Sequence, residues 1–113
     1  MFESLTTSAL TSALTGLAAR QRAIADNIAN VNTPGYQAKR VQFEDALAAS
    51  VARGSGTAEI TTKRSLEPTN TEGNNVNLDT ETLSNIDTVL RYQFAARAVE
   101  GEFTSARTAM RTS

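Results

Sequence analysis

Carboxylate pairs are the first feature of this 113-residue chain that could do chemistry. Asp79 with Glu81, and Glu100 with Glu102, supply side chains that can act as general acid and base. In a helix, residues i and i+2 do not face each other, so we interpret both pairs as solvated helix surface. The chain has no histidine and no cysteine, which removes the commonest general base, thiol nucleophile and soft metal ligands. We therefore predict no enzymatic activity and no catalytic, cofactor-binding or metal-binding residue.

Arginines in the C-terminal part raise a second possibility, binding to nucleic acid. Arg91, Arg97, Arg107 and Arg111 do not keep to one helical face, and acidic residues lie between them. Eleven basic and twelve acidic residues give a formal net charge of −1, so no strong field attracts nucleic acid or anionic lipid. We predict no nucleic-acid partner.

The uncharged segment Ser4–Ala19 needs separate attention. A signal peptide has a basic start and a continuous apolar run, and a spanning helix needs about 20 mostly apolar residues. Serine and threonine interrupt the apolar residues here, and the only early charge is Glu3. We expect neither a cleaved signal peptide nor direct membrane insertion, but a helix that packs against protein on more than one face.

Amide side chains gather where this first helix is expected to end. Asn27 and Asn30 lie in its last turns, and Pro34 disfavours helical geometry at Thr33. Pro34-Gly35 suits the two central positions of a type II turn. Because side-chain amides hydrogen-bond readily to backbone groups, this helix end can bind a segment that docks there.

The first helix, expected over residues 4–32, carries a heptad seam with one polar member. The seam residues alternate in steps of four and three. Gly16 weakens the helix and is expected to mark a close contact or a bend. The seam consists of Leu10, Leu14, Leu17, Gln21, Ile24, Ile28 and Val31.

A long last helix is expected from about 77 to 112, with Asn77 as its N-cap. It carries two apolar stripes, and we expect one to face the first helix and the other to face another molecule. A single broad apolar face within an ordinary bundle is the alternative. The first stripe is Leu83, Ile86, Leu90 and Phe94, and the second is Val89, Tyr92, Ala96, Val99, Phe103, Ala106 and Met110.

The middle of the chain has weaker patterns. Spacing of four between Phe43, Leu47 and Val51 predicts a short helix at 43–53. Residues 54–76 are rich in glycine, serine, threonine and asparagine and are expected to form a flexible connector, with a weak strand pattern at 58–62.

These patterns predict a mainly α fold in which the long terminal helices pair as an antiparallel, coiled-coil-like hairpin. Residues 1–36 and 77–113 are expected to form one assembly domain, and residues 37–76 a loop-rich insert.

Two sequence blocks resemble the terminal signatures of the bacterial flagellar rod, hook and hook-associated proteins. The first runs from Arg20 to Tyr36, and the second runs from Glu72 to Leu78 and leads into Leu90-Arg91-Tyr92-Gln93. Residues 37–72 match no family pattern. The motif positions carried over are Asn27, Asn30, Thr33, Pro34, Gly35, Tyr36, Gly73, Asn74, Asn75 and Val76.

The resemblance implies a structural subunit of the flagellar basal body rod. Residues 73–76 and the short chain favour the proximal rod, where subunits form the hollow drive shaft for motility. Implied partners are copies of the chain, adjoining rod proteins and the base adaptor to the membrane ring and export gate. The implied location is the periplasmic side of the inner membrane, after type III export without signal cleavage.

We expect the subunits to meet through apolar residues of the terminal helices. Two other classes remain open: a small helical adaptor or export chaperone, which would be a compact dimer, and a membrane-active amphipathic helix, which would bind liposomes. The interface predicted for a rod subunit consists of Leu10, Leu14, Leu17, Ile24, Ile28, Val31, Leu83, Ile86, Leu90, Phe94, Val99, Phe103 and Met110.

Overall fold

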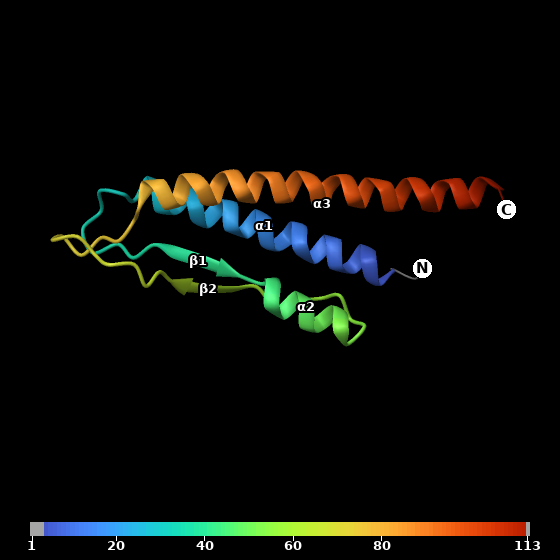
Figure 1. Cartoon of the computed structure of the whole chain (residues 1–113), viewed down its shortest axis with the longest axis horizontal. Coiled ribbons are helices and arrows are strands. Elements are labelled where there is room, and N and C mark those ends of the chain that lie inside the picture. Colours follow the sequence, from blue (N-terminus) through green and yellow to red (C-terminus); the bar gives the residue numbers. More distant parts are fainter. Residues whose placement is uncertain (1–3, 113) are drawn as a thin grey trace.

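A computed structural model describes residues 4–112 as an elongated, mainly helical molecule (Figure 1). Its extents are 66 × 25 × 17 Å and its radius of gyration is 17.7 Å, against roughly 13 Å for a compact domain of this length. The order of elements is α1 (Leu5–Ala29), β1 (Lys39–Gln42), α2 (Glu44–Ala52), β2 (Thr61–Arg64) and α3 (Leu78–Thr112).

The two terminal helices run antiparallel, which confirms the predicted fold class. Figure 1 shows α1 between α3 on one side and the strands with α2 on the other. The side chain of Ser4 caps α1 by accepting a hydrogen bond from the Thr7 backbone N–H at 3.0 Å. The first helix ends at Ala29, three residues before the predicted end, and a turn follows it.

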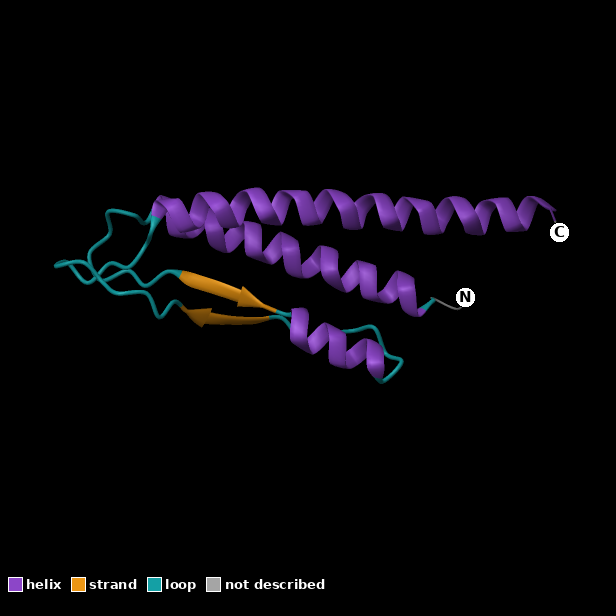
Figure 2. Cartoon of the chain, in the orientation of Figure 1, coloured by secondary structure: helices purple, strands orange, loops and turns teal. Residues whose placement is uncertain are grey.

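The N-cap of α3 is Asn77, as predicted. Its side-chain oxygen accepts hydrogen bonds from the backbone N–H groups of Asp79 at 3.0 Å and Thr80 at 3.2 Å. From there α3 continues without interruption to Thr112. In Figure 2 the end of α3 extends past the first turn of α1, so the two helices do not cover each other along their whole length.

A small core lies where α1 meets β1 and the start of α2. Leu17 and Ala23 of α1 pack there with Val41 and Phe43, and all four are buried. A Cβ on Gly16 would lie 2.5 Å from Cδ1 of Phe43. Gly16 therefore marks a close contact, one of the two roles predicted for it, because only a missing side chain lets the ring approach the helix.

The middle segment is more regular than the sequence predicts. The short helix forms as α2, but residues 54–76 are not simply a flexible connector, because β2 pairs antiparallel with β1. The register places Lys39 opposite Arg64 and Gln42 opposite Thr61. Each strand has four residues, and in this sheet only Val41 is buried. Such short strands lack the alternating pattern that reveals a half-buried strand in sequence.

Candidate functional site

The amide side chains at the end of α1 bind other parts of the same chain. Asn27 is completely buried. Its Nδ2 donates to the Lys39 carbonyl oxygen at 3.0 Å, and its Oδ1 accepts from the Lys39 backbone N–H at 2.8 Å. Oδ1 also accepts from the Tyr36 hydroxyl at 3.2 Å, and Nδ2 donates to Glu81 Oε1 at 3.1 Å. One side chain thus joins α1, the turn after it, β1 and α3.

Asn74 caps the C-terminal end of α1 from a distance in sequence. Its Nδ2 donates to the carbonyl oxygens of Asn30 at 2.9 Å and Thr33 at 2.8 Å. A helix leaves its last carbonyl groups without partners, so a buried donor at this position satisfies them. Asn74 Oδ1 also accepts from the Val76 backbone N–H at 2.8 Å, which shapes the approach to α3.

The side chain of Asn75 binds backbone groups of the segments beside the sheet. Its Oδ1 accepts from the Ala38 backbone N–H at 2.6 Å, and its Nδ2 donates to the carbonyl oxygens of Ser65 and Glu67 at 3.1 and 3.2 Å. The Asn30 side chain bonds locally, with Nδ2 donating to the Asp26 carbonyl oxygen at 2.8 Å and Oδ1 accepting from the Thr33 hydroxyl at 3.0 Å. We call the side chains of Asn27, Asn30, Asn74 and Asn75 the amide cluster.

Two glycines let the segments around the amide cluster approach each other. Gly35 has a φ of 76° and Gly73 a φ of 81°, a region that side chains disfavour. The Gly35 N–H donates to the Glu72 carbonyl oxygen at 2.8 Å. The turn predicted at Pro34-Gly35 forms, with the Tyr36 N–H donating to the Thr33 carbonyl oxygen at 3.2 Å. The structure therefore brings the two sequence blocks into direct contact.

One carboxylate lies in an environment different from the one that we predicted. Glu81 is completely buried, although we predicted solvated helix surface. Its Oε1 accepts from Arg40 Nη1 at 2.6 Å and from Asn27, while Oε2 has no hydrogen-bond partner within residues 4–112. Arg40 also approaches Glu67 at 3.4 Å. The prediction was wrong because Glu81 belongs to the face of α3 that packs on α1.

That face of α3 consists of polar and small residues. We expected one of the two apolar stripes there. The first stripe does not face α1, because Leu83, Ile86, Leu90 and Phe94 are all exposed. Residues of the second stripe are half-buried only at Val89, Ala96 and Val99. The buried positions of α3 recur at three, four and seven residues, a pattern in the sequence that we did not use. They are Glu81, Thr88 and Ala95, with half-buried Ser84 between the first two.

The residues of the predicted interface divide into three groups. Leu17 and Ile24 are buried within the chain, at 3 % and 4 % exposure, and so cannot meet a partner directly. Leu10, Leu14, Val31 and Val99 are half-buried. The third group is exposed: Ile28, Leu83, Ile86, Leu90, Phe94, Phe103 and Met110.

An apolar groove opens where α1 and α3 lie beside the start of α2. It has a volume of about 430 Å³. Leu90 and Phe94 of α3 form one side of it although both are exposed. We refer to it below as the apolar groove, lined by Leu10, Ala13, Leu17, Phe43, Glu44, Leu47, Leu90, Arg91, Phe94 and Ala95.

An ion pair that the sequence did not reveal lies at the rim of the groove. Arg20 Nη1 and Nη2 donate to the two carboxylate oxygens of Glu44 at 2.7 and 2.6 Å, and the guanidinium lies 5.0 Å from the centre of the Phe43 ring. These hydrogen bonds lower the pKa of the Glu44 carboxyl below its ordinary value, against the opposing effect of partial burial. Arg91 Nη1 adds a longer contact to Glu44 at 3.8 Å.

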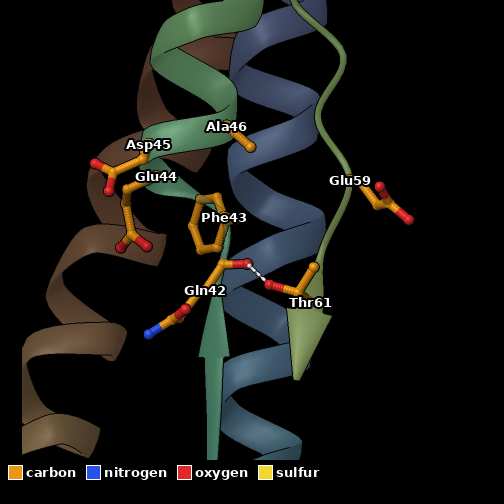
Figure 3. A pocket seen from close by; sticks show the side chains of 7 residues that line it. All are labelled: Gln42, Phe43, Glu44, Asp45, Ala46, Glu59 and Thr61. Carbon is orange, nitrogen blue, oxygen red and sulfur yellow. Dashed lines mark hydrogen bonds between the residues drawn. The ribbon is translucent and has the colours of Figure 1, made fainter. Parts of the chain in front are cut away.

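A second depression adjoins the groove on the other side of Phe43 (Figure 3). Its lining includes Glu44, Asp45 and Glu59, and the Thr61 hydroxyl donates to the Gln42 carbonyl oxygen at 3.2 Å. Figure 3 shows Glu44 and Asp45 on the same side of the first turn of α2, away from Glu59. Within residues 4–112, no three carboxylates lie close enough to bind a metal ion together.

None of the helices in the described part of the chain combines the length and apolar character that crossing a membrane requires. The polar side chains of the amide cluster bind one another or backbone groups, and seven apolar residues of the predicted interface lie on the surface. The arrangement is suited to packing against other protein.

Comparisons with known proteins also point to a protein that assembles with other protein subunits. The model of the flagella basal body rod protein family matches residues 8–37. The chain is similar to the flagellar basal body rod protein FlgB of Escherichia coli (strain K12), with 31% identity over 107 residues that cover 75% of this chain and 78% of the relative. The FlgB protein of Shigella flexneri gives the same values. The FlgB protein of Bacillus subtilis (strain 168) is 29% identical over 117 residues, covering 89% of each chain.

The family model covers α1 and the turn after it, and the relatives extend the similarity over most of the chain. The chain therefore belongs to the flagellar basal body rod protein family and is a structural subunit of the rod.

Proposed function

We propose that this subunit polymerises through α1 and α3 in the proximal part of the rod, and so helps to form the hollow drive shaft of the flagellum. The observation that carries this proposal is the apolar surface of α3. Leu83, Phe94 and Met110 are 69%, 76% and 78% exposed. Leu83, Ile86, Leu90 and Phe94 recur at intervals of three and four and so form one exposed apolar stripe. Proteins that act as monomers rarely expose large contiguous apolar surface, because water contact with it is unfavourable.

The exposed apolar residues continue along nearly the whole of α3. From Leu83 to Met110 the helix rises about 40 Å at 1.5 Å per residue. Within residues 4–112 no further element covers this length, since the strands and α2 lie on the opposite side of α1 from α3 (Figure 1). Neighbouring subunits would remove this surface from water, with a free-energy gain of about 25 cal/mol per Å² buried.

The different surroundings of the terminal helices and of the middle segment support the domain arrangement that we propose. Residues 1–36 and 77–113 supply the assembly surface, and residues 37–76 form an insert that braces them. In this proposal the motif residues at 27–36 and 73–76 hold the two parts together, through the hydrogen bonds of the amide cluster.

Assembly with other rod and basal body components follows from family membership. We propose that the immediate partners are copies of the chain, the adjoining rod proteins and the base adaptor to the membrane ring and export gate. The proposed location is the periplasmic side of the inner membrane.

We propose export through the flagellar type III apparatus with α1 retained. The support is that α1 contributes Leu17 and Ala23 to the core, so its removal would dismantle the fold. We propose no catalytic role, since the family is structural. None of the findings favours the small adaptor or export chaperone.

The test replaces Phe103, which is exposed and has no place in the core. Phe103→Asp puts a charge into the proposed contact, and Thr104→Asp puts the same charge about 100° further round the helix, off the side that carries Val99, Phe103 and Met110. In the bacterium that encodes this chain, we expect Phe103→Asp to abolish motility and rod formation, and Thr104→Asp to preserve both. Circular dichroism of both purified variants controls for folding. Normal swimming and normal rods with Phe103→Asp would refute the proposal.

A further inference from the structure

The two edges of the small sheet differ in how their backbone groups are paired. In an antiparallel pair of strands, residues that bond to the partner strand alternate with residues whose N–H and C=O groups point away from it. The Ser65 N–H donates to the Ala38 carbonyl oxygen at 2.7 Å, and these two residues continue the register of β1 and β2. Along β2, the backbone groups of Lys63 therefore point to β1, and those of Thr62 and Arg64 point away from it.

The outer edge of β1 is covered by side chains of α1. The Lys39 N–H donates to Asn27 Oδ1 at 2.8 Å, and the Lys39 carbonyl oxygen accepts from Asn27 Nδ2 at 3.0 Å. The Val41 carbonyl oxygen accepts from Arg20 Nη2 at 2.8 Å. Figure 2 shows β1 between α1 and β2. This edge of the sheet is therefore closed to a further strand.

The outer edge of β2 has no such cover, and we refer to it as the open edge. All four residues of β2 are exposed. The outward backbone groups of Thr62 and Arg64 form no hydrogen bond with another part of residues 4–112. Unpaired N–H and C=O groups along an edge strand are a template for a further strand.

Leu66 continues the line of the open edge and is fully exposed. The backbone on both sides of it is held in place, because Asn75 Nδ2 donates to the carbonyl oxygens of Ser65 and Glu67 at 3.1 and 3.2 Å. An apolar residue on a fixed backbone loses little freedom when a partner packs against it. A strand that lies along the open edge therefore meets an apolar contact just beyond β2.

Charge indicates the chemistry of the partner. Lys39 lies opposite Arg64, so like charges face each other across the sheet, and the next pair, Arg40 and Lys63, repeats this arrangement. On β1 both cations have carboxylate partners, one on α1 at 3.5 Å and one on α3 at 2.6 Å. Among residues 4–112, Lys63 and Arg64 form no ion pair. Two unpaired cations repel the same edge of a second copy and attract carboxylates.

We propose that the open edge of β2 is a docking site for an acidic, extended segment of a different protein, which adds to the sheet as a third strand. Backbone hydrogen bonds to Thr62 and Arg64 supply the pairing, and carboxylates opposite Lys63 and Arg64 select the partner. An apolar residue of the segment packs against Leu66. This surface is separate from the terminal helices, so the inference goes beyond the proposed function and does not depend on it.

A binding test uses the purified full chain and a fluorescent synthetic peptide in which glutamate alternates with threonine. A second peptide has lysine in place of glutamate, and a third is the acidic peptide N-methylated at every residue, which removes its backbone donors and keeps its charge. We expect the second and third peptides to bind about tenfold more weakly or worse by fluorescence anisotropy. Equal binding of the acidic and N-methylated peptides would overturn the proposal, because it would show charge attraction without strand pairing.

Variants of the chain locate the binding. Lys63→Gln combined with Arg64→Gln should weaken binding of the acidic peptide about tenfold. Arg53→Gln combined with Arg97→Gln removes the same charge from exposed positions outside the sheet and is the matched control. Circular dichroism checks that both variants fold. Equal loss in the two variants, or no binding of the acidic peptide to the unmodified chain, would overturn the proposal and leave the rod function standing.

Hydrogen exchange followed by NMR gives a residue-level readout. Addition of the acidic peptide should slow exchange of the Thr62 and Arg64 amides several-fold, because these groups gain partners. The Lys63 amide already points to β1 and should change less. Peptide binding that leaves the Thr62 and Arg64 amides unprotected would also overturn the proposal.

Discussion

The two ends of α3 lie on one helix and have opposite surroundings. At its first turns Glu81 is buried, Asn77 caps the helix, and the amide cluster binds the adjacent backbone groups. At its last turns every residue from 100 to 111 is exposed, and these include the large apolar side chains of Phe103 and Met110. The chain completes one end of its long helix itself and leaves the other to be covered by another molecule.

The kind of interaction explains this difference. Hydrogen bonds are directional, and a buried polar network with its partners in place fixes a single arrangement of the segments that it joins. Apolar contact is non-directional and scales with the area removed from water. The first end therefore sets the geometry of the subunit, and the second provides surface for association.

The largest expected effect is a difference in stability between a substitution in the core and one on the exposed surface of α3. Leu17→Asp puts an unpaired charge into the core and should lower the free energy of unfolding by about 4 kcal/mol or more. Phe103→Asp lies on the surface and should change it by less than about 0.5 kcal/mol. Urea unfolding followed by circular dichroism measures both. Equal destabilisation would mean that Phe103 is packed within the monomer.

The next effect concerns the amide cluster. Asn27→Ala removes a buried side chain with four hydrogen bonds and leaves the Lys39 backbone groups without partners. We expect a loss of about 3 kcal/mol, the upper part of the range for an unsatisfied buried group. Asn32→Ala, at an exposed position close by, is the control and should have little effect. Similar stability of the two variants in urea would show that the cluster does not hold this end together.

Replacing two of the glycines by alanine should change the stability of the fold in opposite directions. Gly73→Ala forces a side chain into a φ of 81° and places a Cβ 3.4 Å from the Gly35 Cα, so it should destabilise by about 1 kcal/mol or more. Gly101→Ala meets no atom within 4 Å and should stabilise α3 by about 1 kcal/mol. Thermal unfolding compares the two variants. A decrease in Tm for Gly101→Ala would argue against a solvent-exposed helix at that end.

The smallest expected effect is electrostatic. Hydrogen bonds from Arg20 lower the pKa of Glu44, so the carboxylate stabilises the folded state above the pKa that it has when unfolded. This contribution is lost as pH falls through the lower, folded-state pKa. Because Glu44 is partly exposed, Glu44→Gln should cost only about 0.5 kcal/mol near neutral pH.

Urea titrations from neutral to acidic pH provide the check. The difference in stability between Glu44→Gln and the unmodified chain should shrink towards acidic pH. A difference that stays constant over that range would show that Glu44 does not act through its charge.

The main helices could be predicted from the sequence because their signals are local. Heptad spacing, the N-cap at Asn77 and the turn at Pro34-Gly35 each depend on neighbouring residues. The side of α3 that meets α1 could not be predicted in the same way. It depends on Arg40 and Asn27 being brought to Glu81 by β1 and α1, and 41 and 54 residues separate them from Glu81 along the chain.

The strands and the core residues show the same limit. Each strand has four residues with little alternation. Asn75, far from β1 in sequence, binds Ala38 just before β1 and Ser65 just after β2. Leu17 and Ile24 have the same spacing as the exposed residues of the predicted interface. Only the position of Phe43 and Val41 against α1 reveals that Leu17 belongs to the core.

Amide hydrogen exchange along α3, compared between dilute protein and assembled rods, tests the central claim most directly. Backbone amides of the first turns, near Glu81, should exchange slowly in both samples, because the Asn77 cap and the buried Glu81 side chain already hold this end within the subunit. Amides from 100 to 111 should exchange quickly in dilute protein and slowly after assembly. Slow exchange of these last turns in dilute monomer, or no change on assembly, would contradict the account.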